Sequence, residues 1–172
     1  MIIIRDMQPA DCEMISHAFR LQGWKKPVGQ FVQYSREIAA HDKDVLVAEL
    51  DGFFAGYAVI TWESYYPPFK EQGIPEIQDL NVLKKYQRRG VASHLMEEAE
   101  KRISHHAAMA GIGVGLTADY GAAQILYVKR GYVPDGLGVS QNEVFIKSGE
   151  RIEVNDDLVL QLKKKLSGWS DP

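Results

Sequence analysis

The sequence predicts a mixed α/β or α+β domain, and three patterns along the chain support this fold class. The first is a β-hairpin, because the runs DVLVAEL and FFAGYAVITWE, both rich in β-forming residues, flank an Asp51-Gly52 turn. The second is a strand, EIQDLNV, followed by a helix that we expect from about Val91 to His106. The third is a buried strand, IGVGLTA, after that helix. Antiparallel strands followed by a β-α-β unit are typical of a mixed sheet.

The N-terminal part of the chain is predicted to hold one strand and two helices. Residues 2–5 form the strand, and a helix begins near Asp11, or at Pro9 and its neighbours. Apolar residues then recur at helical spacing until Gly23 ends the run. After a loop, WKKP, the segment VGQFVQYSREIAAH has the pattern of a second amphipathic helix.

The remaining segments complete the predicted order of elements. The stretch SYYPPFKEQGIP is expected to be a loop because it is rich in proline, glycine and aromatic residues. YGAAQILYVKR is expected to be a short helix that Gly131 closes, and DDLVLQLKKKL a final strand with a basic end.

Length, charge and cysteine content limit the classes of protein that the chain can be. At 172 residues, with no repeat or linker-like stretch, we expect one domain over residues 1–172. A formal net charge of −3 argues against a general binder of nucleic acid or anionic membranes. Cys12 is the only cysteine, which excludes an internal disulfide and a zinc site of several thiolates. With no signal-peptide pattern and no membrane-spanning run, a cytoplasmic protein is expected.

The segment QRRGVA, at a strand-to-helix junction, has the chemistry of an anion site. A helix N-terminus exposes unpaired N–H groups and a positive dipole end, and Gly90 would let a phosphate approach the backbone. Arg88 and Arg89 add cations whose planar donors suit phosphate oxygens. No P-loop motif is present, and GIGVG enters a strand rather than leaving one, which argues against a dinucleotide fingerprint.

Two motifs resemble those of the GCN5-related N-acetyltransferases. QRRGVA matches the Q/R-x-x-G-x-G/A signature through Gln87, Gly90 and Ala92. AAQILYVKRGYVPDG is similar to a second hallmark, A-x-x-L-Y-x-K-x-G-F, through the positions Ala123, Leu126, Tyr127, Lys129, Gly131 and Tyr132. The resemblance covers nearly the whole chain. It implies the acyl-CoA N-acyltransferase fold, a central and mostly antiparallel sheet with helices on both faces.

The resemblance also implies acetyl-CoA as cosubstrate and assigns residues that would bind it. The strand before the signature loop would bond the pantetheine arm through its backbone, which places Leu80, Asn81 and Val82 at the cofactor. The backbone N–H of Leu80 is the candidate donor to the oxyanion. The loop itself, with the helix start, would hold the pyrophosphate through the residues Gln87, Arg88, Arg89, Gly90, Val91, Ala92 and Ser93.

The same resemblance assigns catalytic roles to two side chains. Tyr127 aligns with the tyrosine that family members use as general acid toward the CoA sulfur; its other interpretation is a packed core tyrosine. Glu76, eleven residues before Gln87, aligns with the general base of the histone-acetylating branch; an exposed strand-end carboxylate, Asp79 as base, or a water chain are the alternatives. Strand alternation puts Glu76 and Asp79 on opposite faces unless a bulge intervenes. Tyr120 departs from the family, which often has Asn at that position.

We therefore expect direct transfer of an acetyl group to a primary amine, on a small cationic molecule or a protein lysine or N-terminus. Trp24, Tyr65, Tyr66 and Phe69 could line the acceptor site or pack within their own loops. A non-catalytic CoA-sensing module, and O-acetyl or other acyl transfer, are the alternatives. A homodimer is possible on the family's pattern. No metal is expected, since adjacent His105 and His106 would point about 100° apart on a helix.

Overall fold

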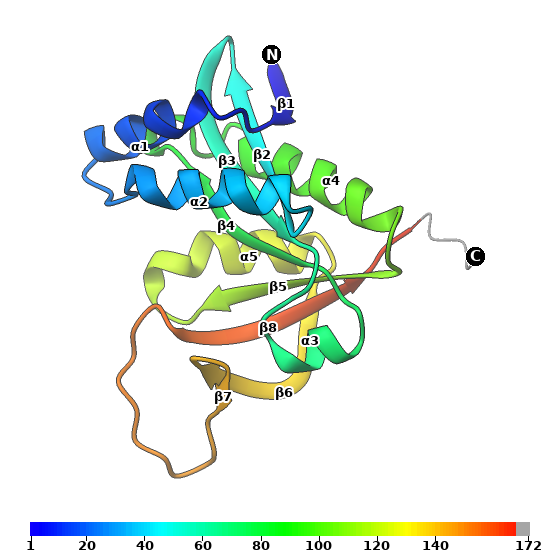
Figure 1. The fold of residues 1–172 in the computed structure, drawn as a ribbon. Helices are drawn as coiled ribbons and strands as arrows, with labels where there is room; N and C mark the ends of the chain where they lie inside the picture. The colour runs from blue at the N-terminus through cyan, green and yellow to red at the C-terminus, as the bar shows by residue number, and fades with distance from the viewer. Residues whose placement is uncertain (168–172) are drawn as a thin grey trace. The chain divides into compact units, whose positions relative to one another are not determined.

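The computed structural model describes residues 1–167, and the chain divides into two compact units, each built from two separate segments (Figure 1). Unit 1 comprises Met1–Trp62 and Ile77–Arg102. Unit 2 comprises Glu63–Glu76 and Ile103–Pro172. The single domain over residues 1–172 stays a prediction.

Unit 1 holds four strands in the order β1-β2-β3-β4, and β1-β2 and β2-β3 pair antiparallel. The elements that lie wholly or mostly in it are β1 (Ile2–Asp6), α1 (Asp11–Leu21), α2 (Val28–Ala39), β2 (Lys43–Leu50), β3 (Phe53–Thr61), β4 (Glu76–Val82), the 3-10 helix η1 (Lys84–Tyr86) and α4 (Val91–Ser104). The first residue of β4, Glu76, and the end of α4 from Ile103 on are assigned to unit 2. The predicted hairpin is confirmed: Asp51 and Gly52 have φ values of 54° and 83°, the left-handed conformation that a tight hairpin turn requires.

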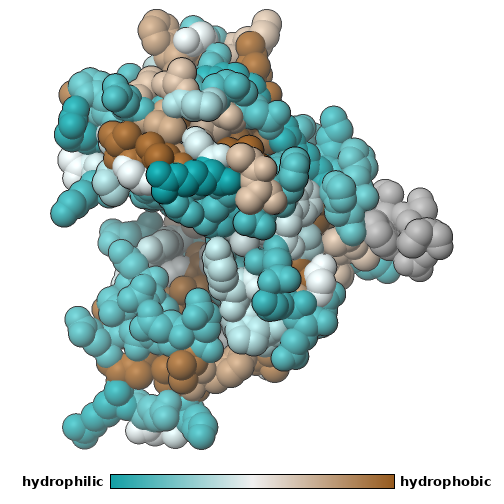
Figure 2. Space-filling model, in the orientation of Figure 1, coloured by the Kyte–Doolittle hydropathy of each residue, from teal (hydrophilic) through white to brown (hydrophobic). Residues whose placement is uncertain are grey.

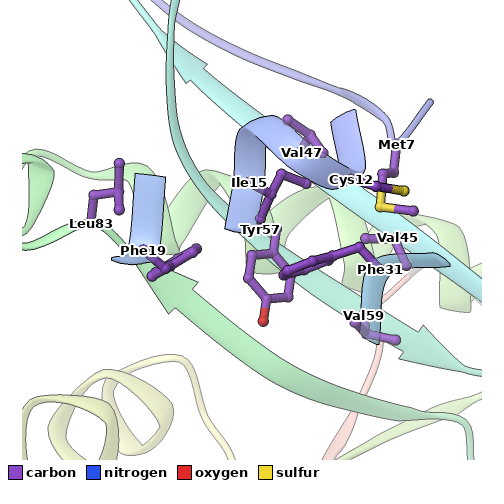
Figure 3. Packing of buried hydrophobic residues seen from close by; sticks show 10 residues of the cluster. All are labelled: Met7, Cys12, Ile15, Phe19, Phe31, Val45, Val47, Tyr57, Val59 and Leu83. Carbon is purple, nitrogen blue, oxygen red and sulfur yellow. The ribbon is translucent and has the colours of Figure 1, made fainter. Parts of the chain in front are cut away.

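The core of unit 1 lies between the strand pair β2-β3 and the helices α1 and α2 (Figure 3). Its buried residues are Met7, Cys12, Ile15, Phe19, Phe31, Val45, Val47, Tyr57, Val59 and Leu83. Alternate residues of β2, such as Leu46, are buried as well, so both faces of this strand are covered. Figure 3 shows the Tyr57 ring within the cluster and its hydroxyl oxygen directed away from the aliphatic side chains.

Unit 2 is a second antiparallel arrangement, with strands in the order β5-β8-β6-β7. Its elements are α3 (Pro67–Glu71), β5 (Met109–Gly115), the 3-10 helix η2 (Ala118–Tyr120), α5 (Gly121–Lys129), β6 (Val133–Gln141), β7 (Val144–Phe145) and β8 (Leu158–Lys165). Strand β8, the last strand within residues 1–167, therefore lies between β5 and β6. Gly131 closes α5 with φ 90°, as predicted.

Two boundaries in unit 2 differ from the sequence prediction. The segment expected to be a loop contains α3, because Pro67 suits the first turn of a helix and Phe69 of that turn is buried against Tyr66. The strand expected to start at Ile112 starts at Met109 and ends at Gly115. Its register with β8, from Met109↔Lys165 to Gly115↔Val159, sets these bounds.

The surface in Figure 2 is mainly hydrophilic, with hydrophobic residues in small separated areas. No helix within residues 1–167 combines the length and the apolar character that crossing a membrane requires.

Candidate active site

The loop that leads into α4 is shaped to receive an anion. Arg88 and Gly90 have φ values of 58° and 85°, and α4 begins directly afterwards at Val91. Within residues 1–167, the amides of Val91 and Ala92 have no backbone acceptor, as expected for the first turn of a helix. The first turn carries no acidic residue. The positive end of this helix of 14 residues is therefore available to a negatively charged group.

Side chains hold this loop in place and leave its cations exposed. Gln87 Nε2 donates to the carbonyl of Val82 at 3.3 Å, which ties the loop to the end of β4. His94 Nδ1 lies 2.9 Å from the carbonyl oxygen of Gly90. Arg88 and Arg89 are both exposed; Arg89 forms a loose ion pair with Asp51 at 3.7 Å, and its guanidinium lies 5.7 Å from the centre of the Tyr86 ring. Both guanidinium groups can therefore turn toward a phosphate.

Strand β4 is distorted where the pantetheine-binding residues were predicted. Asp79 has a φ of 48°, in the left-handed region that interrupts a regular strand. The neighbouring strand approaches closely here: a Cβ added to Gly56 of β3 would lie 2.4 Å from the carbonyl oxygen of Asn81. A glycine is thus required at position 56, and a glycine inside a strand run is the sequence signal for such an approach. The distortion lies directly before Leu80, the candidate oxyanion donor.

The Asp79 carboxylate is the centre of a polar cluster in unit 1. Its oxygens accept hydrogen bonds from five side chains: Lys26 (2.6 Å), Gln30 (2.8 Å), Tyr34 (3.0 Å), Tyr57 (2.5 Å) and Asn81 (2.7 Å). Burial and the negative charge of Asp79 raise the pKa of Tyr57 and of Tyr34 well above the ordinary value, so both hydroxyls stay protonated donors. We call these six residues the Asp79 cluster.

The Asp79 cluster changes the choice of general base. A carboxylate whose oxygens already accept five hydrogen bonds, one of them from the cation Lys26, serves as a structural acceptor. Because the carboxylate oxygens of Asp79 are already occupied by these donors, Glu76 is favoured over Asp79 as the general base. The four donors that lie far from Asp79 in the sequence could not be found by sequence reasoning; they are Lys26, Gln30, Tyr34 and Tyr57. The only local signal is the i, i+4 spacing of Gln30 and Tyr34 on one helix, which does not point to Asp79.

Glu76 is buried rather than exposed at the end of its strand. Glu76 is only 4% exposed, and Ser64 Oγ donates a hydrogen bond to Glu76 Oε2 at 2.5 Å. Ser64 in turn accepts from the backbone N–H of Tyr66 at 3.1 Å. The interpretation of Glu76 as an exposed carboxylate is therefore wrong. A second hydroxyl nearby, that of Tyr66, donates to Asp135 at 2.7 Å.

Tyr127 lies on α5 and is 5% exposed. Burial, together with the negative charge that Tyr120 would carry if ionised, raises the pKa of Tyr127 to about 12. The hydroxyl therefore keeps its proton throughout the physiological range, as a general acid must. Its ring also packs with that of Tyr132 at 6.3 Å, so the side chain is both buried and able to donate.

Tyr120, the departure from the family pattern, fills a specific space in unit 2. A Cβ added to Gly115 would lie 2.4 Å from the Tyr120 ring, so the ring lies flat on the end of β5. Burial and a hydrogen bond to Asp156 raise the pKa of Tyr120 to about 12. An asparagine side chain would be too short to reproduce this ring packing.

A family model named Acetyltransferase (GNAT) domain matches residues 41–134, more than half of the chain. The chain belongs to the GNAT acetyltransferase family. A comparison with curated protein sequences gives no match.

Solved GNAT structures share the fold over nearly the whole length. The protein yncA of Salmonella typhimurium, solved with its cofactor acetyl-CoA, is 16% identical with a TM-score of 0.70 over 99% of this chain and 97% of that one. Ribosomal-protein-alanine N-acetyltransferase of Brucella melitensis is 19% identical, with a TM-score of 0.68 over 95% and 99%. Mutant forms of the spermidine/spermine N-acetyltransferase SpeG of Vibrio cholerae are 17% identical, with a TM-score of 0.67 over 98% and 97%.

These matches confirm the predicted GNAT family, the mixed α/β fold and the class of acetyltransferase enzyme. Acetyl-CoA is the cosubstrate of the family, which agrees with the anion-binding loop before α4. The roles of individual residues stay predictions.

The aromatic residues predicted to line the acceptor site separate into two groups. Phe69 is 1% exposed and packs against Tyr66 in unit 2, and Trp24 stacks on Phe19 at 5.8 Å in unit 1. These two side chains therefore serve packing. Tyr65 is 60% exposed, and Tyr66, although buried, lines a pocket of unit 2. Within residues 1–167, no group of three His, Cys, Asp or Glu side chains could share a metal ion.

Proposed function

We propose that this GNAT enzyme transfers the acetyl group of acetyl-CoA directly to a primary amine, on a small cationic molecule or on a protein lysine or N-terminus. The observation that carries the proposal is the junction at Gly90. There, a left-handed glycine, a helix start with unpaired amides and two exposed arginines form one anion-binding surface.

The residues of unit 1 fit the parts of acetyl-CoA. The amides from Arg88 to Ser93 would hold the pyrophosphate, with the exposed guanidinium groups of Arg88 and Arg89 beside it. The backbone of Leu80, Asn81 and Val82 would hold the pantetheine arm, because the distortion at Asp79 interrupts regular strand geometry at this point. Acetyl-CoA supplies an acetyl group activated as a thioester.

Three protein groups are assigned to the chemistry. Glu76 would take a proton from the acceptor ammonium, so that the neutral amine can attack. The N–H of Leu80 would stabilise the negative charge that develops on the carbonyl oxygen. As the C–N bond forms and the C–S bond breaks, Tyr127 would give its proton to the departing thiolate. The products are an acetamide and the CoA thiol.

The named activities of structural neighbours support an amine acceptor. The Brucella protein is named for the alanine of a ribosomal protein, and the Vibrio protein for spermidine and spermine. Both act on amines, one on a protein and one on a polyamine. We also propose a cytoplasmic location and a homodimer.

The proposal is tested by measuring acetyl-CoA binding and product formation together. We expect calorimetry to give a saturable response to acetyl-CoA, and mass spectrometry to find one added acetyl group on an amine from a panel of diamines, amino alcohols and lysine peptides. A product on a hydroxyl, or a heavier acyl group from another donor, would support the alternative acyl-transfer activities.

A CoA-sensing module would bind the cosubstrate without forming any product. Absence of both binding and product would contradict the proposed function altogether. Glu76→Gln separates these cases further, since it should keep acetyl-CoA binding and lose turnover, most strongly at low pH where the acceptor amine is protonated.

A further inference from the structure

Unit 2 contains a pocket that the assigned catalytic residues do not use. Its volume is about 200 Å³, and the residues that matter for its chemistry are Tyr66, Ser140, Glu143, Asp156, Asp157 and Gln161. This is smaller than the pockets of roughly 300–1,000 Å³ that enclose drug-sized ligands. It can hold the end of a small aliphatic molecule.

The charge of this pocket has one sign. Glu143, Asp156 and Asp157 stand at its exposed rim, and its lining, as far as residues 1–167 form it, includes no lysine or arginine. Neighbouring carboxylates without a cation repel one another, so the rim favours a positively charged occupant. Among the described residues no three acidic groups lie close enough to share a metal ion, which leaves an organic cation as the matching chemistry.

The floor of the pocket contains an unused hydrogen-bond acceptor. Gln161 is 8% exposed, and its Oε1 is buried without a donor among residues 1–167. A buried amide oxygen without a donor costs free energy, and such exceptions call for an explanation such as a ligand. Ser140, 5% exposed, adds a hydroxyl to the same floor. An N–H donor that entered the pocket would satisfy these acceptors.

The acidic rim is held in position by its own supports. Asn155 Oδ1 accepts from the backbone N–H of Asp157 at 3.0 Å and from Gln141 Nε2 at 2.9 Å. Tyr120 donates to Asp156. The tyrosine that departs from the family pattern thus fixes one carboxylate of the rim. Tyr66 contributes an aromatic ring, a surface that suits an ammonium group.

We propose that this pocket binds the distal ammonium group of an aliphatic diamine or polyamine whose other amine is acetylated. The inference rests on the proposed function and names its acceptor class. The distal nitrogen would donate to Gln161 Oε1 and pair with the Asp156 and Asp157 carboxylates. The enzyme would thereby select acceptors that carry a second ammonium group in addition to the amine that is acetylated.

The test compares two acceptors that differ only at the distal group, 1,4-diaminobutane and 4-amino-1-butanol. We expect the KM of the wild-type enzyme to be about tenfold lower for the diamine, the effect of one favourable charge-assisted contact. Asp157→Asn should remove most of that difference by raising the KM for the diamine alone. Gln161→Met should also raise the KM for the diamine, and the exposed control Glu71→Gln should change neither KM.

Equal KM values for the two acceptors in the wild-type enzyme would overturn the inference, as would an Asp157→Asn variant that keeps the preference. Failure of the proposed function looks different, because neither acceptor would then be acetylated. In that case calorimetric titration with 1,4-diaminobutane still tests the pocket. Saturable binding that Asp157→Asn abolishes would support it, and no binding to the wild-type protein would refute it.

Discussion

Two groups of carboxylates, one in each unit, differ in how completely the protein satisfies them. In unit 1, Asp79 accepts hydrogen bonds from five side chains, and one of these donors is the cation Lys26. In unit 2, Asp156 and Asp157 stand at the rim of a pocket in which residues 1–167 place neither a lysine or arginine nor a donor to the buried Gln161 Oε1.

The difference indicates which carboxylates serve the structure and which are available to a ligand. A satisfied buried acceptor stabilises the conformation around it, here the left-handed residue in β4. A buried polar atom without a partner, such as Gln161 Oε1, costs stability unless a ligand supplies that partner, whereas the exposed carboxylates of Asp156 and Asp157 are hydrated.

The strongest contrast should appear between buried tyrosines with different roles. Tyr127→Phe removes the proposed general acid, and we expect kcat to fall by roughly 10²- to 10⁴-fold, the contribution typical of general acid–base catalysis. Affinity for acetyl-CoA should stay close to that of the wild type. Steady-state kinetics and calorimetry measure the two quantities.

The control is Tyr132→Phe, in the neighbouring buried ring 6.3 Å from Tyr127. It should keep kcat near the wild-type value. If both variants turn over at the wild-type rate, the assignment of Tyr127 as acid is wrong. Because the pKa of Tyr127 is about 12, its deprotonation should not limit the rate between pH 7 and pH 10.

Asp79→Ala should destabilise the protein far more than Asp157→Asn does. Removing the acceptor leaves Lys26 and the Tyr57 hydroxyl without their partner, which we expect to lower the free energy of unfolding by about 2–3 kcal/mol. Asp157→Asn should change it by less than about 0.5 kcal/mol. Urea unfolding measures both, and equal losses would remove the distinction between the Asp79 cluster and the exposed carboxylates of the pocket rim.

Gly90→Val should weaken acetyl-CoA binding by about tenfold or more, because a branched side chain obstructs the phosphate site and its backbone disfavours φ 85°. Gly138→Val is the matched control: the φ of Gly138 is 83°, and within residues 1–167 no atom beyond its chain neighbours lies within 4 Å of an added Cβ. The control should carry a similar cost in stability and leave the Kd unchanged. Similar Kd values for the two variants would contradict the phosphate role of the loop.

The smallest effect concerns Asp11, another satisfied carboxylate of unit 1. Burial acts to raise its pKa, but hydrogen bonds from Arg5 at 2.7 and 2.9 Å and from the Gln8 amide outweigh burial and lower it. Because the pKa of Asp11 is lower in the folded than in the unfolded protein, the Asp11 carboxylate adds stability at pH values above its unfolded-state pKa of about 3.9. This stability is lost as the pH falls through the folded-state pKa.

Wild-type protein should therefore exceed Asp11→Asn in free energy of unfolding by about 1 kcal/mol at pH 7, a typical size for a partly exposed pair. The difference should shrink below pH 4. A difference that is independent of pH between 7 and 3 would show that the Arg5 pair contributes nothing through charge.

Features governed by neighbouring residues could be predicted from the sequence, and those made by distant residues could not. The Asp51-Gly52 hairpin and the Gly90 loop depend on local backbone chemistry, and both lie where the sequence placed them. The Asp79 cluster joins Lys26 to a residue 53 positions away, and no periodicity reports such a contact.

Burial of polar groups was the second limit of sequence reasoning. One interpretation of the sequence has Glu76 as an exposed carboxylate at a strand end, but the residue is buried and accepts a hydrogen bond from Ser64. Gln161 carries no motif at all, since its meaning depends on the pocket around it. The helix α3 was missed because proline, which usually marks a loop, is also suited to the first turn of a helix.

The insertion of β8 between β5 and β6 has a consequence for biosynthesis. Met109 pairs with Lys165, and Val133 pairs with Lys163, so the strand that lies between β5 and β6 leaves the ribosome after both of them. Until it emerges, β5 and β6 in the nascent chain lack their shared partner, and closing such long loops is slow. A premature stop before Leu158 would therefore leave both strands with unpaired edges, prone to aggregation and proteolysis.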